Sequence, residues 1–430
     1  MRCCLIDTHG KNNRSWRRTG WFAAALLAVT LPAFGQDTWT LAGAIRRALE
    51  VAPELQLADA ELNAREAAIR QAAAWPNPDI ELRADDKIGK DSGAGGRDFT
   101  QLALSQSLPL FSSKRQRTRE AAEAEWHAAQ FDRQQQTLAV EVDTARIFHD
   151  LQQVQAQWQL AQQRLELADA LQQTAQRRKQ AGELSHLEQL RLDILREQAQ
   201  QAVDREEGEL SEAHTRFRTR LDLPAQPVAT LVALAPVSPP PPLEDLQARL
   251  LDHAVLQSAT RRTTAAYSNV AVARAERIPD PVLQLFRERD FLDGRVQDVT
   301  GIGLGISLPL WDRNRGRIQA AQARVSAAGI EAAARERTLR AELEQRHTHL
   351  RHLSQQASHF QQRVLQPARE VLALTRKAYA AGEAEILALV DAHDTYFDAQ
   401  SRYFDLLHDA GVEAAQLRLA AGRSLLDEEK

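Results

Sequence analysis

Two long stretches of the chain place apolar residues at alternating spacings of three and four positions, which is the repeat of a coiled-coil seam. The first stretch occupies residues 112–181, which contain neither proline nor glycine, and the second occupies residues 312–381. About 70 helical residues at 1.5 Å each would extend about 105 Å, far more than the diameter of a globular domain. The seam positions are Val140, Thr144, Ile147, Leu151, Val154, Trp158, Ala161, Leu165 and Ala168 in the first stretch, and Leu339, Leu343, Leu350, Leu353, Ala357, Phe360 and Val364 in the second. The pattern predicts long antiparallel coiled-coil helices.

A glycine follows each long stretch, and helical patterning then resumes. Gly182 and Gly382 stand at these two points. Because glycine commonly ends a helix in a left-handed conformation, we expect each to form a sharp turn between two antiparallel helices. The second helix of each pair is predicted at 183–220 and at 383–421.

Two shorter regions alternate apolar residues with polar or very small ones, as amphipathic β-strands do. In the first region Ile80 and Leu82 alternate with charged residues, although Asp86 interrupts the apolar face, and a glycine-rich turn follows at 89–96. The returning strands carry Leu102, Leu104, Leu108 and Leu110, and then Ile302, Leu304, Ile306, Leu308 and Leu310. Strands of about ten residues with one apolar face are typical of transmembrane β-barrels. The same pattern also fits a soluble hairpin that packs on a helix.

These elements occur twice in the same order. The motif Ser-Leu-Pro-Leu-aromatic stands at 107–111 and 307–311, and Ala-Gly-Glu stands at 181–183 and 381–383, so both motifs recur after 200 residues. A repeat with one constant offset at two motifs indicates a duplicated unit.

Each repeat is predicted to contain a first helix, a β-hairpin, a long helix and a second long helix. The first helices are expected at 41–74, with a bend near Pro53, and at 243–277. The hairpins are expected at 79–111 and 281–311. The repeats themselves are expected at 36–224 and 243–430, joined at 225–242 by a proline-rich linker that includes four consecutive prolines and should be extended.

The first 35 residues have the features of a secretory signal peptide. Arg14, Arg17 and Arg18 precede an apolar run at 21–31, and small residues suited to a signal peptidase follow. The run is too short to span a bilayer. Both cysteines, Cys3 and Cys4, lie before it. A mature chain that begins near residue 36 therefore has no cysteine for a disulfide or for lipid attachment.

Composition excludes several classes of protein. A net charge of −4 argues against nucleic-acid binding, and a mean hydropathy of −0.44 with 43% hydrophobic residues argues against a polytopic helical membrane protein. No nucleophile elbow, phosphate loop or zinc-protease motif is recognisable. We therefore expect neither an enzyme nor a bound cofactor.

Strand number limits how the hairpins could sit in a membrane. Four strands are too few to close a barrel, since closed barrels begin at about eight strands and open strand edges are not stable in lipid. If the strands are in a membrane, several chains must share one barrel.

Together, the signal peptide, the duplicated helix–hairpin–helix units, the two Ser-Leu-Pro-Leu-aromatic motifs and the two glycine turns resemble the TolC-type outer membrane efflux family. The resemblance covers essentially the whole mature chain. It implies a mainly α fold with a small β-barrel part, in which a homotrimer contributes four transmembrane strands per chain to a 12-stranded barrel and the helices form a periplasmic α-barrel. The segment 307–316, Ser-Leu-Pro-Leu-Trp-Asp-Arg-Asn-Arg-Gly, looks especially like the branch that exports cobalt, zinc, cadmium or copper.

The resemblance also implies a location, partners and a site. The channel would lie in the outer membrane of a Gram-negative bacterium, in contact with its lipid, and extend into the periplasm to meet an adaptor protein and an inner-membrane pump of the resistance-nodulation-division (RND) type. The glycine turns would form the periplasmic tip that docks on the adaptor, through Ala181, Gly182, Ala381 and Gly382. Acidic residues beyond them would line the closing aperture, and Glu188 and Asp391 match those positions. Ala384 and Ala388 stand where the family has a basic and an acidic residue, so its latch network is not expected here.

Several histidines lie close together at 347–359, and His349 and His352 have the i, i+3 spacing that could hold a metal ion on a helix. They lie off the predicted seam, and no acid or cysteine completes a convincing set of ligands. We expect a solvated helix face rather than a metal site.

The expected function is a passive exit duct for heavy-metal cations in a tripartite efflux system. Two alternatives fit the sequence. One is a duct for organic drugs or solvents, because a wide lumen selects little by itself. The other is a periplasmic coiled-coil scaffold or adaptor that never enters the membrane.

Overall fold

The computed structural model describes residues 38–83, 101–110, 113–180, 185–225, 229–292 and 295–429. The predicted signal peptide at 1–35, the glycine-rich turn at 89–96 and the turn residues Ala181 and Gly182 lie outside these ranges. Helices dominate the described part of the chain, and none of them is both long enough and apolar enough to cross a bilayer.

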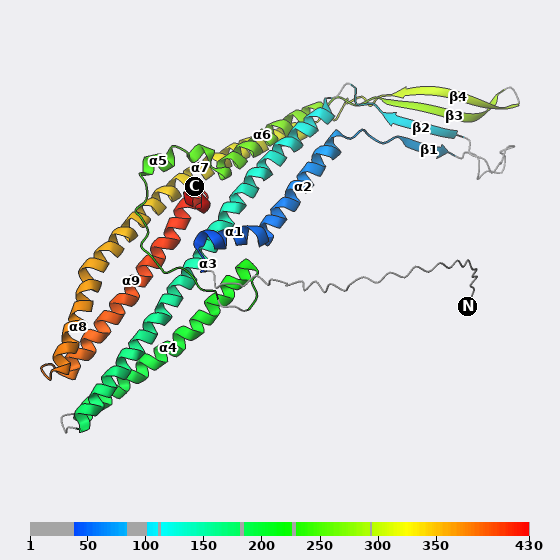
Figure 1. Cartoon of the computed structure of the whole chain (residues 1–430). Helices are drawn as coiled ribbons and strands as arrows, with labels where there is room; N and C mark the ends of the chain where they lie inside the picture. Colours follow the sequence, from blue (N-terminus) through cyan, green and yellow to red (C-terminus); the bar gives the residue numbers. More distant parts are fainter. Residues whose placement is uncertain are drawn as a thin grey trace, which may run out of the picture. The chain divides into compact units, whose positions relative to one another are not determined.

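Elements of the first half and of the second half follow the same order (Figure 1). The first half contains α1 (Leu41–Val51), α2 (Pro53–Ala73), β1 (Asp79–Arg83), β2 (Gln101–Ser107), α3 (Lys114–Gln180) and α4 (His186–Leu221). The second half contains α5 (Leu243–Gln247), the short 3₁₀ turn η1 (Leu250–Asp252), α6 (Ala254–Ala275), β3 (Val282–Leu292), β4 (Arg295–Gly305), α7 (Arg315–Phe360), the π-helical turn η2 (Gln361–Leu365), α8 (Gln366–Ala380) and α9 (Ile386–Ala420). The 3₁₀ segment η3 (Leu425–Glu429) follows α9.

Helix interruptions have local causes. Pro53 is the first residue of α2, so the bend expected there is a break between two helices. The single helix expected at 243–277 is wrong, because α5 and η1 precede α6 and the side chain of His253 caps α6 by accepting a hydrogen bond from the N–H of Val255. The helix expected at 312–381 contains the π-helical turn η2, which ends two residues before Pro367, whose missing N–H cannot continue the α-helical hydrogen-bond ladder.

The four strands form one antiparallel sheet in the order β1-β2-β3-β4. Ile80 pairs with Leu104, Leu104 with Leu285, and Leu285 with Ile302, so these apolar positions of the four strands share one face. Farther along β3 and β4 the same face carries the polar residues Arg287, Arg289, Asp298 and Thr300. The opposite face is mixed, with small and polar residues beside Val282, Phe286 and Val299. There the ring of Phe286 covers Gly301, where an added Cβ would come within 2.4 Å of the ring, which explains a glycine at this position.

Both returning strands end earlier than the alternation predicts, at Ser107 and Gly305 rather than near 110 and 310. A proline follows in each motif, and proline has no N–H to donate to a strand ladder. The chain instead makes a tight turn, in which Leu110 N donates to Leu108 O at 2.7 Å and Leu310 N donates to Leu308 O at 2.9 Å. The duplicated motif thus forms a duplicated turn between sheet and helix.

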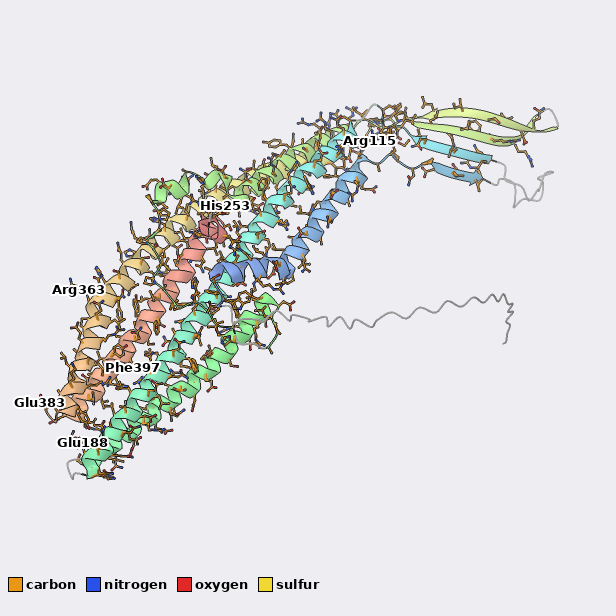
Figure 2. The ribbon with its side chains drawn as sticks, in the orientation of Figure 1. Arg115, Glu188, His253, Arg363, Glu383 and Phe397 are labelled. Carbon is orange, nitrogen blue, oxygen red and sulfur yellow. The ribbon has the colours of Figure 1, made fainter. Side chains whose placement is uncertain are left out.

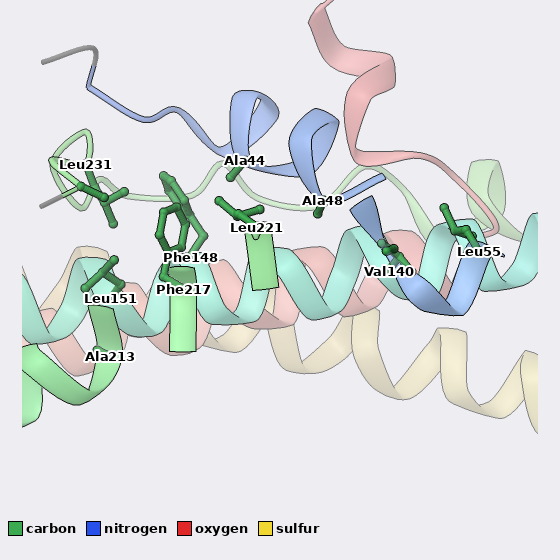
Figure 3. Packing of buried hydrophobic residues seen from close by; sticks show 12 residues of the cluster. Ala44, Ala48, Leu55, Val140, Phe148, Leu151, Ala213, Phe217, Leu221 and Leu231 are labelled. Carbon is green, nitrogen blue, oxygen red and sulfur yellow. The ribbon is translucent and has the colours of Figure 1, made fainter. Parts of the chain in front are cut away.

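The helix α3 contacts α2, α4, α6 and α9, and α9 also contacts α7 and α8. The start of α4 and the turn between α8 and α9 lie at the same end, away from the sheet, and Glu188 and Glu383 mark this end in Figure 2. Phe148 and Phe217 stand in the largest buried cluster, which joins α1, α3 and α4 (Figure 3). Residues 229–242 of the linker contain no helix and are held by hydrogen bonds from Gln152 Nε2 to Val232 O (2.8 Å) and between His347 Nε2 and Pro241 O (2.9 Å).

Candidate functional site at the helical turns

The turn between α8 and α9 depends on the backbone conformation of Gly382. Its φ of +79° is left-handed, which residues with a Cβ rarely adopt. Gly382 N donates to Tyr379 O at 3.1 Å and Glu383 N donates to Ala378 O at 2.9 Å. These two bonds form a Schellman motif with Ala381 as the C-cap. The carbonyls that end α8 are therefore paired, and the turn is fixed in shape.

The turn between α3 and α4 is described only at its borders. Gln180 ends α3 and Ser185 caps α4, whereas Ala181 and Gly182 lie outside the described residues. The side chain of Glu188 belongs to a capping box. Its Oε2 accepts hydrogen bonds from the N–H of Ser185 (2.9 Å) and from the Ser185 hydroxyl (2.9 Å), while Glu188 N donates to Ser185 Oγ at 3.2 Å.

The two predicted acids differ in their surroundings. The hydrogen bond from the Ser185 backbone, followed by the one from the Ser185 side chain, lowers the pKa of Glu188, so its carboxylate keeps its charge in mildly acidic conditions. Asp391 is exposed on α9 and has no ion pair among the residues that the structure describes. Glu188 thus also has a structural role, whereas nothing described around Asp391 holds its carboxylate.

Near the turns, the two helical hairpins pack against each other. A buried cluster contains residues of all four helices: Ala168, Leu171, Ala175, Leu192, Leu195, Ala199, Leu372, Tyr379, Ile386, Leu389 and Ala392. The guanidinium of Arg178 lies 5.1 Å from the centre of the Tyr379 ring, which links α3 to α8. The helix ends beside the two turns therefore belong to one packed unit.

A polar contact between α3 and α9 was not predicted. Arg164 on α3 forms an ion pair with Asp394 on α9 at 2.6 Å, and the neighbouring His393 is fully buried with its Nδ1 3.3 Å from Asp394 Oδ1. Burial lowers the pKa of His393. These residues are 230 positions apart in sequence, and no local pattern relates them.

The histidines at 347–359 do not converge. His349 Nδ1 lies 3.3 Å from Glu413 Oε2, which also pairs with Arg346 at 3.2 Å, and His352 is exposed beside a surface hollow that it shares with His359. The expectation that all of them lie off the seam is wrong for His347, which is buried and contacts the linker. Within the described ranges, no group of three or more histidine, cysteine or acidic side chains is arranged to hold a metal ion.

Known proteins share the sequence pattern and the fold of this chain. The family described as outer membrane efflux protein matches residues 44–221 and 246–423, one match in each half of the chain. The cobalt-zinc-cadmium resistance protein CzcC of Cupriavidus metallidurans is 25% identical over 372 residues, which cover 86% of either protein.

Solved structures share the fold. The CusC structure, described for conformational changes that accompany folding and transmembrane channel formation, matches with a TM-score of 0.73 at 19% identity and covers 89% of this chain and 92% of CusC. The Campylobacter jejuni CmeC outer membrane channel matches with a TM-score of 0.74 at 15% identity and covers 90% of this chain and 86% of CmeC. Since the family match extends over most of the sequence in two consecutive copies, the chain belongs to the outer membrane efflux protein family.

Proposed function

We propose that this chain is the outer membrane exit channel of a tripartite efflux system and that it passes heavy-metal cations. Three copies assemble, their strands cross the outer membrane of a Gram-negative bacterium, and their helices extend into the periplasm. The channel is passive and performs no catalysis. An inner-membrane RND pump supplies the energy, and an adaptor protein joins the two components.

One observation carries the membrane assignment, namely the apolar face that the sheet leaves exposed. The side chains of Ile80, Ile302 and Leu304 are 70%, 73% and 74% exposed, and Leu285 between them is 51% exposed. An exposed apolar row of this kind, which crosses all four strands, calls for lipid or another protein to cover it. Lipid is the better fit, because alternation of apolar and small or polar residues over four adjacent strands is the pattern of a transmembrane β-barrel.

Closure of such a barrel requires more than one chain. The edge strands β1 and β4 each have one neighbour in the sheet of a single chain. Unpaired strand edges are costly in lipid, where no water satisfies their N–H and C=O groups. Three chains with four strands each would pair every edge in a 12-stranded barrel, which leaves β1 of one copy beside β4 of the next.

Three further observations support the adaptor contact and the metal cargo. The helix ends beside the two turns pack together at the end away from the sheet, which suits a docking surface for an adaptor, with Gly382 and Ala381 expected in one turn and Gly182 and Ala181 in the other. Carboxylates such as Glu188 and Asp391 around a narrow lumen would concentrate cations and repel anions. The likeness to CzcC, whose name refers to cobalt, zinc and cadmium resistance, supports metal cations as the cargo.

A deletion strain tests this proposal. Growth should be measured on a panel of Zn²⁺, Co²⁺, Cd²⁺, Cu⁺ and antibiotics, with and without the gene on a plasmid, and the protein should be followed in membrane fractions. We expect sensitivity to one or more metals that the plasmid reverses, and a heat-resistant trimer in the outer membrane. Sensitivity to antibiotics alone would instead identify a channel for organic compounds. Soluble monomers in the periplasm would contradict the channel and favour a scaffold.

A further inference from the structure

Positive side chains gather where the sheet meets the helices. The helices α3 and α7 both begin shortly after the proline turns that end β2 and β4, and Arg115 marks this junction in Figure 2. Around these two helix starts stand Lys114, Arg115, Arg117, Arg119, Arg313, Arg315 and Arg317, which we call the basic belt. The belt occurs in both repeats, at positions close to the 200-residue offset of the motifs.

The placement of the basic belt is electrostatically unfavourable for the helices themselves. A helix N-terminus carries partial positive charge, so acidic residues are the stabilising choice in the first turn. Neither α3 nor α7 has an acidic residue in its first turn. The belt instead adds positive charge to two helix ends that are already positive, and an external anion would relieve that repulsion.

Some members of the belt have internal partners. Arg117 pairs with Glu120 at 2.8 Å and Arg119 pairs with Glu123 at 2.7 Å. Glu276, the C-cap of α6, pairs with both Arg317, at 3.5 Å, and Lys114, at 3.8 Å.

Arg313 and Arg315 differ from these residues. Both are exposed, and neither forms an ion pair with any residue in the described part of the chain. They are not on a loose loop, because Asn314 between them is buried and has a left-handed backbone. Asn314 Nδ2 donates to Ala273 O at 2.7 Å and to Glu276 Oε2 at 3.2 Å, and Asn314 N donates to Asp312 Oδ1 at 2.9 Å. The two arginines therefore project from either side of an anchored residue.

Exposed tryptophans lie beside the belt on the side of the sheet. Trp311 is 92% exposed, and Trp75 is 54% exposed with the Arg115 guanidinium 4.7 Å from its ring centre. Leu308 and Leu310, next to Trp311, are also exposed. Tryptophan is enriched where membrane hydrocarbon gives way to headgroups, since its ring is apolar and its N–H can donate a hydrogen bond. Along the chain, an apolar strand is thus followed by an exposed tryptophan and then by the two arginines that form no ion pair with the described residues.

We infer that the basic belt binds the phosphates of anionic phospholipid headgroups in the periplasmic leaflet of the outer membrane, with Arg313 and Arg315 as its main contacts. This inference rests on the proposed function, because it requires the sheet to be embedded in lipid. Charge complementarity and continuity with the apolar face of the sheet identify lipid as the occupant. The guanidinium groups donate to phosphate oxygens, Trp311 lies between headgroups and acyl chains, and the two helix N-termini add their own attraction for the phosphate.

Tryptophan quenching tests the inference. The purified protein is reconstituted into bilayers in which a brominated acyl chain is carried either by phosphatidylglycerol or by phosphatidylcholine. Bromine quenches only tryptophans that contact acyl chains, so competition between the two lipids yields their relative affinity for the protein surface. We expect phosphatidylglycerol to be preferred about fivefold or more in low salt, and the preference to fall at high salt. The variant Arg313→Gln/Arg315→Gln should lose most of this preference.

A matched control is available on the same helix. Arg337 and Arg351 are exposed residues of α7 that form no ion pair with residues in the described ranges, and both lie well beyond the junction. The variant Arg337→Gln/Arg351→Gln removes the same charge and should keep the preference of the unaltered protein. Equal loss in both variants would mean that net charge alone attracts the lipid, which overturns the assignment to the belt.

Other outcomes separate this inference from the proposed function. Normal channel conductance without any preference between the two lipids would overturn the inference and leave the channel intact. Abolition of the preference by millimolar inorganic phosphate would show a site for free anions rather than for headgroups, and would also overturn it. Failure to insert into bilayers or to conduct ions would overturn the proposed function, and the inference with it.

Discussion

Replacing Gly382 with alanine should loosen the turn between α8 and α9, whereas the same replacement at Gly329 should strengthen α7. Neither glycine has another atom within 4 Å of the position where a Cβ would stand, so steric overlap affects neither variant. The variants differ only in backbone conformation, since Gly382 has a φ of +79° and Gly329 lies inside a regular helix.

The expected magnitudes follow from that difference. A residue with a Cβ loses about 1–2 kcal/mol in the left-handed conformation. Alanine in the interior of a helix gains about 0.5–1 kcal/mol over glycine. The same substitution of alanine for glycine should therefore destabilise the turn at position 382 and stabilise α7 at position 329. A loss of about 1–2 kcal/mol corresponds to a factor of roughly 5–30 in the ratio of closed to open states.

Hydrogen exchange measures this change locally, which suits a large protein in which a single turn contributes little to the overall melting temperature. The amides of Gly382 and Glu383, which donate to Tyr379 O and Ala378 O, should lose protection by that factor in Gly382→Ala, while the end of α7 near the sheet remains unchanged. In Gly329→Ala, protection around residue 329 should rise or stay constant. Unchanged protection at the turn in Gly382→Ala would refute the left-handed conformation and the Schellman motif.

Three further outcomes are expected. Gly182→Pro and Gly382→Pro should abolish metal efflux and leave trimers in the outer membrane. Proline at 382 cannot adopt a positive φ or donate a hydrogen bond to Tyr379 O. Normal metal tolerance in these variants would exclude the turns as the docking surface. Glu188→Gln/Asp391→Asn should reduce the preference for cations over anions in single-channel recordings. Because glutamine at 188 preserves the capping box, this variant alters the charge and not the start of α4. Unchanged selectivity would mean that these carboxylates do not face the lumen. Burial lowers the pKa of His408, but hydrogen bonds from His408 to Asp150 and Asp409 raise it by more, so the pKa is raised overall. Protonated His408 therefore contributes fully to the stability of the fold below about pH 6.5, and this contribution is lost as the pH rises through the raised pKa. The denaturation midpoint of the unaltered protein should therefore fall toward that of His408→Gln over this pH range. A constant difference between the two midpoints would show that the ion pair between His408 and Asp150 is absent.

The long helices could be predicted closely because their signal is repeated many times. The seam spacing places a helix at 112–181, and α3 runs from Lys114 to Gln180. The mainly α fold of an efflux channel was likewise predictable from the duplicated order of elements, and the family match confirms it. Errors occurred where one residue or one hydrogen bond decides the outcome. Apolar alternation continues past Pro109 and Pro309, yet β2 ends at Ser107 and β4 ends at Gly305, before prolines that have no N–H for a strand ladder.

The contacts of individual side chains near the turns were less predictable than the helices. The capping box could have been found, since Ser185 and Glu188 have the Ser-x-x-Glu spacing at a helix start. The contact between Arg164 and Asp394 could not, because the coiled-coil pattern identifies which face of each helix is buried but not which helix of the other repeat packs against it. Docking and lumen roles of the turn residues remain predictions.

Duplication of the backbone does not make the two acids equivalent. The helix α4 begins at His186 and α9 begins at Ile386, so the 200-residue offset holds at this point too. Under that offset Glu188 corresponds to Ala388, and Asp391 corresponds to Arg191. Glu188 is the third residue of its helix and Asp391 the sixth, which separates the two acids by about 4.5 Å along the helix axis. In a trimer the carboxylates would therefore form two sets of three at successive levels rather than one ring of six. In that arrangement the greater separation would lessen the repulsion between the two sets of carboxylates.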